Sequence, residues 1–249
     1  MTETFRGFDG APLALHRYGE GRPLLLLHGL FSDARMNWIK FGHAETIAAQ
    51  GYEVIMPDLR AHGASAAPHA AAAYPPDVLV RDLAALVDHL ALERFDLGGF
   101  SLGARTVLHG VAKGVVGPER LIVGGMGTDG LTNGSRRAAH FARVIDEFEA
   151  IPKSDPAWYA VQFLKSQKID RVAARHLIGS FTDLPHDLLE RVTMPTLVVC
   201  GAEDHDNGSA PDLAARLPNA TYAEVPGTHM GSVTRRELGR AIARWLGPG

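Results

Sequence analysis

Residues 95–110 of this chain are FDLGGFSLGARTVLHG, and the fold can be inferred from this segment outward. A short apolar run ends at Leu97, and a helix-like run begins at Leu102. Between them stands Gly99-Phe100-Ser101-Leu102-Gly103, with small residues two before and two after the serine. A serine on a tight strand-to-helix turn crowds the neighbouring backbone, so small residues are needed there. The pattern predicts a nucleophile elbow, in which the helix start offers free N–H groups to a developing oxyanion.

The composition is that of an ordinary globular protein. The chain has 249 residues, of which 46% are hydrophobic and 21% charged, and its formal net charge is −3. Nothing in this balance indicates nucleic acid as a partner. The first residues lack the basic and apolar regions of a signal peptide, and no apolar run approaches the ~20 residues of a membrane span. We therefore expect a cytoplasmic protein that binds neither nucleic acid nor a membrane. The sequence does not predict an oligomeric state.

Apolar runs bounded by glycine or proline alternate with helix-like segments along the chain. A buried strand is predicted for each of these runs: Leu24–Leu27, Val54–Met56, Phe95–Leu97, Leu121–Val123 and Thr196–Cys200. Helical stripes lie between them, one beginning near Leu79 with Asp77 as its N-cap, and another in the last segment, Thr234 to Leu246. This order predicts an α/β fold with a mostly parallel central sheet flanked by helices. The single cysteine, Cys200, is expected to be buried in a strand.

One stretch, residues 129–191, breaks the alternation with helical patterns and no convincing strand. We expect it to be a helical cap inserted into a core made of residues 1–128 and 192–249. The cap should cover one edge of the sheet and roof a pocket. Most of its aromatic residues are expected to pack within the cap, and a minority to line an apolar cavity. These residues are Phe141, Phe148, Trp158, Tyr159, Phe163 and Phe181.

The order of these features resembles the α/β-hydrolase superfamily over nearly the whole chain except the insertion. In that family an acid follows a late strand, and a histidine follows the last strand. The segment from Thr196 to Asp204, TLVVCGAED, resembles the strand, glycine and acid, and AEVPGTH, ending at His229, resembles the histidine loop. The resemblance implies that Ser101 is the nucleophile, that His229 is its base and that Asp204 orients the base. It implies no cofactor.

Two other carboxylates compete with Asp204 for the role of the acid. Asp206 lies in the same loop, and Asp129 follows the preceding strand, where some family members carry their acid. The string from Asp204 to Gly208 also has a faint likeness to a calcium loop. It lacks the bidentate glutamate at the required offset, so no metal site is expected.

The segment His28-Gly29-Leu30-Phe31 resembles the family's His-Gly segment after an early strand. The resemblance implies an oxyanion hole formed by the backbone N–H groups of Leu30 and Leu102, with His28 as a structural residue. Phe31 stands where the family often has glycine, which suggests a differently shaped loop and a narrower pocket.

A second loop also departs from the family. The stretch Asp58 to Ser65 resembles a supporting loop with Ala61 in place of a glycine, and its His62 and Asp58 are assigned to structure. Phe31, Phe100 and Met230 flank the motif positions and are expected to bind substrate.

The resemblance implies a serine hydrolase, similar to carboxylesterases, that acts on a small ester or a related acyl compound. Four alternatives on the same scaffold remain open: hydrolysis of a carbon–carbon bond or of a lactone, perhydrolysis, and acyl transfer to another alcohol. A slow-turnover small-molecule receptor is an alternative from another class. Epoxide hydrolases and haloalkane dehalogenases are disfavoured, because the families that catalyse those reactions use an aspartate nucleophile where this chain has Ser101.

Overall fold

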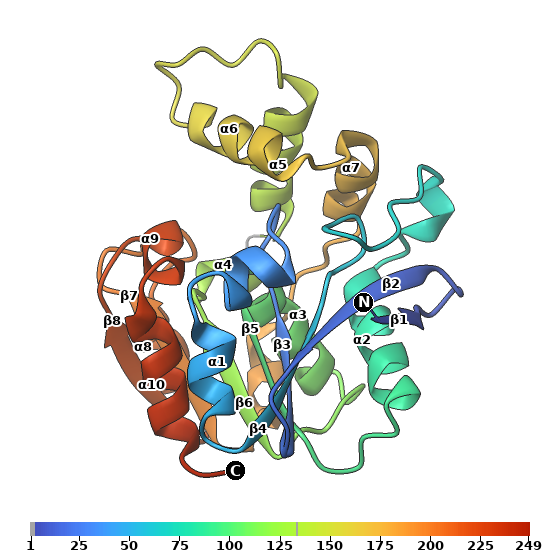
Figure 1. The fold of residues 1–249 in the computed structure, drawn as a ribbon. Helices are drawn as coiled ribbons and strands as arrows, with labels where there is room; N and C mark the ends of the chain where they lie inside the picture. Colours follow the sequence, from blue (N-terminus) through green and yellow to red (C-terminus); the bar gives the residue numbers. More distant parts are fainter. Residues whose placement is uncertain (1–2, 133) are drawn as a thin grey trace.

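The computed structural model of the chain describes residues 3–132 and 134–249. At its centre is a twisted sheet of eight strands in the order β1-β2-β4-β3-β5-β6-β7-β8 (Figure 1). The strands are β1 Glu3–Arg6, β2 Pro12–Tyr18, β3 Arg22–Leu27, β4 Tyr52–Pro57, β5 Asp96–Phe100, β6 Arg120–Gly124, β7 Thr196–Gly201 and β8 Ala220–Val225. From β4 to β8 in this order all neighbouring strands pair in parallel, whereas the pairs β1–β2 and β2–β4 are antiparallel. The predicted α/β fold with a mostly parallel sheet is confirmed.

Helices cover both faces of the sheet because its central strands are apolar on both sides. Along β3, Leu24 and Leu26 pack into one cluster of buried residues, and Leu25 and Leu27 into the other. One cluster includes residues of α2, α3 and α8, and the other includes residues of α1 and α10. These helices are α1 His43–Ala48, α2 Val78–His89, α3 Leu102–Ala112, α8 Ala210–Arg216 and α10 Arg236–Leu246. Among the helices described, none has the length and apolar character that crossing a lipid bilayer demands.

Asp77 occupies the N-cap position of α2, as predicted, but its side chain does not cap the helix. Its backbone is left-handed, with φ 58°, and its side chain makes no capping hydrogen bond. The carboxylate instead pairs with Lys113, the residue that follows α3, and accepts a hydrogen bond from Thr182. An acid that bonds to neighbouring elements is no longer available to the first N–H groups of its own helix, so Asp77 stands at the N-cap position without capping the helix through its side chain.

Helical segments connect β6 to β7 and lie above the carboxyl ends of the parallel strands (Figure 1). They are α4 Asp129–Thr132, α5 Gly134–Asp146, α6 Trp158–Gln167 and α7 Arg171–Gly179. Buried residues of α5, α6 and α7 form a cluster of their own, which also takes in Phe31 from the loop after β3. The side chain of Phe31 therefore links the sheet's carboxyl edge to this helical layer.

Candidate active site

Ser101 lies at a sharp turn between β5 and α3. Its backbone has φ 52° and ψ −111°, a sparsely populated region for a residue with a side chain, which costs on the order of 1–3 kcal/mol. The two flanking glycines make the turn possible. A Cβ atom on Gly99 would lie 2.3 Å from the carbonyl carbon of Gly103, and one on Gly103 would lie 2.3 Å from the carbonyl oxygen of Leu27. The small residues two before and two after the serine are therefore required by close backbone packing, as the sequence indicates.

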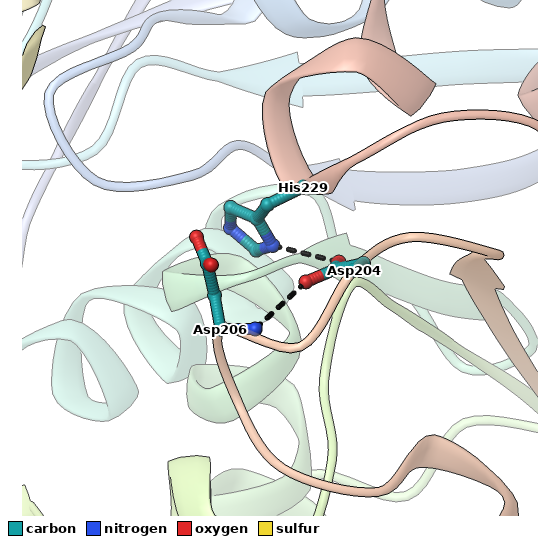
Figure 2. A group of neighbouring side chains, drawn as sticks. All are labelled: Asp204, Asp206 and His229. Atoms are coloured by element: carbon teal, nitrogen blue, oxygen red, sulfur yellow. Dashed lines mark hydrogen bonds and ion pairs between the residues drawn. The ribbon is translucent and has the colours of Figure 1, made fainter.

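Ser101, His229 and Asp204 come together from three different strand ends. Ser101 follows β5, Asp204 follows β7, and His229 begins the short helix α9 His229–Val233 after β8. The Ser101 Oγ to His229 Nε2 distance is 2.9 Å, and the His229 Nδ1 to Asp204 Oδ2 distance is 2.8 Å (Figure 2 shows the second pair). An ionised carboxylate only accepts hydrogen bonds, so Nδ1 carries the proton and Nε2 is free to accept one from the serine. This is the arrangement of a serine activated by an oriented base.

The Asp204 carboxylate is buried and accepts three hydrogen bonds. The Asp204 side chain is only 1% exposed, and besides His229 it accepts hydrogen bonds from the Asp206 N–H and the Cys200 thiol. Burial on its own would raise the pKa of Asp204, but its hydrogen bond with His229 and the other bonds hold the pKa below its ordinary value. Burial, reinforced by the Asp204 charge, raises the pKa of Cys200 to about 12. Cys200 is therefore a neutral thiol that supports the acid, and it is buried in β7 as expected.

The competing acids occupy other positions. Asp206 is exposed, and its side chain points towards His229 from the opposite side to Asp204 (Figure 2). Asp129 begins α4 and lines the cavity beside the site. Asp204, Asp206 and His229 offer polar atoms within 4.8 Å of one another, which is close enough to consider a metal ion. However, His229 Nδ1 and Asp204 Oδ2 already bond to each other, and His229 Nε2 bonds to Ser101 Oγ.

The loop after β3 brings Leu30 to the wall of the cavity that contains Ser101. The N–H groups on either side of Leu30 are already used: Gly29 N–H donates to Asn37 Oδ1 at 3.0 Å, and Phe31 N–H donates to His62 Nε2 at 2.9 Å. Within the described residues, the Leu30 N–H has no protein acceptor. The Leu102 N–H belongs to the first turn of α3, where amides have no partner within the helix. Two backbone donors thus remain free beside the serine, although their role as an oxyanion hole stays a prediction.

Two buried histidines hold this loop in place. His28 donates from Nδ1 to Gly29 O at 2.8 Å and accepts at Nε2 from Leu59 N–H at 2.9 Å. His62 donates from Nδ1 to Arg60 O at 2.9 Å while its Nε2 accepts from Phe31. Each ring must therefore be neutral. Burial lowers the pKa of both histidines, that of His62 to about 3. These contacts are those of structural residues.

The two departures from the family pattern leave the backbone in a glycine-like conformation. Phe31 has φ 60° and Ala61 has φ 66°, both in the left-handed region that costs a residue with a Cβ atom roughly 1–2 kcal/mol. The Phe31 ring packs edge-on against Phe141 of α5, with ring centres 5.7 Å apart. The loop therefore keeps its shape, and the extra side chain fills part of the space between sheet and helices.

A cavity of about 820 Å³ contains Ser101 and His229 and is roofed by α5 and α6. All three residues predicted to bind substrate line it: Phe31, Phe100 and Met230. Of the six aromatic residues in the helical segment, Phe141, Tyr159 and Phe163 line the cavity, and Phe148, Trp158 and Phe181 do not. The sequence did not indicate the other lining residues, which are Ser32, Met36, Asn37, Phe41, Arg137, His140, Ala160, Val233 and Thr234. No motif marks these residues, because they reach the cavity through tertiary packing.

Comparison with known proteins gives the following similarities. The profile described as alpha/beta hydrolase fold matches residues 22–121. An epoxide hydrolase from Caballeronia sordidicola is 36% identical over 39% of this chain and 28% of its own length. A non-heme haloperoxidase from Rhodococcus erythropolis is 27% identical over 91% of this chain and 92% of its own length. The solved structure of a thermophilic esterase from Thermogutta terrifontis, with malate bound, has a TM-score of 0.73 at 24% identity and covers 99% of this chain and 98% of that one. The chain spans less than a third of the length of the epoxide hydrolases that it matches.

Proposed function

We propose that this chain, whose residues 22–121 match the model of the alpha/beta hydrolase fold, is a serine hydrolase of the carboxylesterase type on that scaffold. Its substrate is a small ester or a related acyl compound, cleaved through an acyl-enzyme on Ser101. The observation that carries the proposal is the continuous pair of hydrogen bonds from Ser101 Oγ to His229 and from His229 to the buried Asp204. This geometry supports nucleophilic attack by the serine oxygen, because its proton has an acceptor at 2.9 Å.

In the proposed first step, Ser101 Oγ attacks the ester carbonyl carbon while His229 Nε2 takes the hydroxyl proton. The carbonyl oxygen becomes an oxyanion, which the Leu30 and Leu102 N–H groups bind, each donor contributing ~3 kcal/mol to transition-state stabilisation. His229 then protonates the leaving alcohol, and the bond between the carbonyl carbon and the alkoxy oxygen breaks. Asp204 keeps the imidazole in the correct tautomer and stabilises the imidazolium.

In the second step, water attacks the acyl-enzyme, and His229 takes a proton from this water. The tetrahedral intermediate collapses, the acid leaves, and His229 returns the proton to Ser101. The cavity is lined largely by aromatic and aliphatic side chains, which suits an apolar acyl or alcohol group.

The names of the relatives do not all point to ester hydrolysis. The epoxide hydrolase similarity covers only 39% of this chain. An enzyme that opens an epoxide by covalent catalysis in this superfamily uses an aspartate at the elbow, where this chain has Ser101. The serine favours acyl chemistry over epoxide opening.

Perhydrolysis is a second candidate, favoured by the similarity to a haloperoxidase over 91% of the chain. Here hydrogen peroxide replaces water as the attacking nucleophile on the acyl-enzyme. The carbonyl–Ser101 bond breaks, and a peracid leaves instead of an acid. A peracid then oxidises a halide without any redox group in the protein. This reaction needs the same triad and oxyanion donors as ester hydrolysis.

A substrate panel tests the proposal. Wild type and Ser101→Ala, purified from a host free of background esterases, are compared on p-nitrophenyl esters of two to eight acyl carbons, on lactones and on vinylogous diketones. Peracid formation is followed with acetate and hydrogen peroxide. We expect hydrolysis of the esters that disappears in the Ser101 variant. Wild-type rates in the variant would refute the proposal, and turnover slower than once per minute on every compound would favour a receptor.

A further inference from the structure

The cavity around Ser101 carries several charged or polar side chains on one part of its wall. Asp129, Arg137, His140 and Asp206 come from α4, α5 and the loop after β7. The rest of the lining is mostly aromatic or aliphatic. Among the described residues that line the cavity, Arg137 is the one permanent cation. A cation inside a pocket that contains a nucleophile is a feature that ester hydrolysis alone does not require.

Arg137 is held in place but is not neutralised by a neighbouring side chain. It is half-buried, its Nη1 donates to the main-chain carbonyl oxygen of Asp206, and its guanidinium carbon lies 5.6 Å from the centre of the Phe141 ring. A guanidinium has five N–H donors in a fixed fork. Within residues 3–132 and 134–249, no carboxylate oxygen lies within salt-bridge distance of it. Most of its donors are therefore available to a ligand.

The nearby acids do not compensate for the burial of this charge. The Asp206 side chain points towards His229 (Figure 2), so Asp206 offers Arg137 its carbonyl rather than its carboxylate. Burial lowers the pKa of Arg137, although the charges of Asp206, Asp204 and Asp129 act in the opposite direction. An additional anion in contact with the guanidinium would offset more of this cost than carboxylates at a distance, because Coulomb attraction falls with separation.

We propose that Arg137 is a substrate-binding residue and that the preferred substrates are esters that carry a second, free carboxylate. This inference rests on the proposed function and names its substrate class. A planar guanidinium binds a carboxylate through two parallel N–H···O bonds, which orients the ligand as well as attracting it. Arg137 and Ser101 line the same cavity of about 820 Å³. With the carboxylate on Arg137 and the ester at Ser101, the hydrocarbon between them lies along the aromatic lining.

The test compares three p-nitrophenyl esters of equal length. One is the monoester of adipic acid, the second is the 6-methylheptanoate, in which two methyl groups replace the carboxylate oxygens, and the third ends in a trimethylammonium group. The proteins are wild type, Arg137→Gln and Arg175→Gln. Arg175 is the matched control, because it lies on α7, pairs with Asp146 and does not line the cavity.

We expect wild type to prefer the acidic ester over its uncharged counterpart. Arg137→Gln should lower the ratio of the two kcat/KM values by about 10- to 100-fold, the range of a charge-assisted hydrogen-bonded pair, and Arg175→Gln should leave it unchanged. Asp206→Asn should raise the same ratio, because it removes a repelling charge from the cavity. If Arg137 only held the loop in place through its bond to Asp206 O, its loss would slow hydrolysis of the acidic and the uncharged ester alike. The ratio of their kcat/KM values would then stay unchanged.

Two results would overturn the inference while the proposed function stands. The first is Ser101-dependent hydrolysis of the uncharged ester, with the same ratio of the two kcat/KM values in wild type and in Arg137→Gln. The second is a preference of wild type for the trimethylammonium ester. The second would mean that Asp129 and Asp206 set the field of the cavity. Failure of the proposed function is distinguishable, because none of the three esters would then be hydrolysed in a Ser101-dependent way.

Discussion

Asp204 and Asp206 are two residues apart in one loop, yet they have opposite environments. Asp204 is buried at the end of β7 and accepts hydrogen bonds from a ring N–H, a thiol and a backbone amide. Asp206 is exposed and lines the cavity. A carboxylate that must fix an imidazole tautomer needs the first environment, in which its oxygens have little freedom to turn towards solvent.

We expect Asp204→Asn to lower kcat for p-nitrophenyl acetate by about 10³- to 10⁴-fold, because an amide in this position favours the wrong tautomer of His229. Asp206→Asn should lower kcat by less than about tenfold, because Asp206 makes no side-chain hydrogen bond with the imidazole. Circular dichroism confirms that both variants fold. The reverse pattern of losses would assign the role of the acid to Asp206.

Among single residues, the sequence predicted those that belong to a linear motif. Ser101, Asp204 and His229 each stand at a recognisable position after a strand, and the structure brings their side chains within hydrogen-bonding distance. Arg137 could not be predicted in this way. It belongs to a helix whose pattern indicates only amphipathicity, and its place in the cavity depends on how that helix packs over the sheet.

At the scale of elements, the turn between β5 and α3 depends on backbone contacts that only glycine permits. Gly103 lies in the first turn of α3, against the carbonyl group of Leu27 at the end of β3. This close approach presses the helix start against the sheet and fixes the direction of Ser101.

Gly103→Ala should lower the free energy of unfolding by about 3 kcal/mol or more, because the added methyl group overlaps a backbone oxygen that has no room to move. Gly179→Ala in α7 is the matched control. Its Cβ would meet no atom within 4 Å, so its stability should stay the same or rise by less than about 1 kcal/mol. Urea denaturation measures both values. Equal stability of the two variants would contradict the packing account of the elbow.

The loop after β3 shows what sequence patterns leave open at this scale. The glycine-to-phenylalanine departure at Phe31 suggested a differently shaped loop. The structure instead keeps a left-handed residue there, with its N–H bonded to His62. The strain at Phe31 is offset by packing against the helical segment, a contact between residues 110 positions apart in sequence that no local pattern contains.

At the scale of the whole molecule, the sequence predicted the parallel core better than its edge. The largely buried strands β3 to β7 appear as apolar runs between glycines and prolines. The antiparallel strands β1 and β2 were not predicted. They lie at one side of the sheet, where several of their residues are exposed, so their sequences lack a continuous apolar run.

The stability of the whole molecule should depend on acidity through its buried neutral histidines. His109 of α3 is 1% exposed, neither ring nitrogen has a hydrogen-bond partner among the described residues, and Asp77 is 3.6 Å away. Burial lowers the pKa of His109 from 6.5 to about 4, although Asp77 opposes the shift. Between these two pH values the unfolded chain binds a proton that the folded chain does not, so the free energy of unfolding falls as the pH falls below 6.5.

His109→Met should therefore increase the free energy of unfolding by about 1–2 kcal/mol more at pH 5 than at pH 7, because the variant lacks this buried titrating group. His89→Met, a change at an exposed histidine of α2, serves as the control and should show no such difference. Urea denaturation at the two pH values measures the effect. An equal gain at both values would show that His109 is not held neutral by its surroundings.

If the proposed function is correct, Ser101 carries the acyl group during turnover. The most direct measurement mixes the protein with p-nitrophenyl acetate, quenches with acid within milliseconds and locates the acetyl group by peptide mass spectrometry. We predict an acetyl group on Ser101 that appears together with a stoichiometric burst of p-nitrophenolate, and neither in Ser101→Ala. Turnover without any adduct on Ser101, or an adduct on another side chain, would show that Ser101 is not the nucleophile.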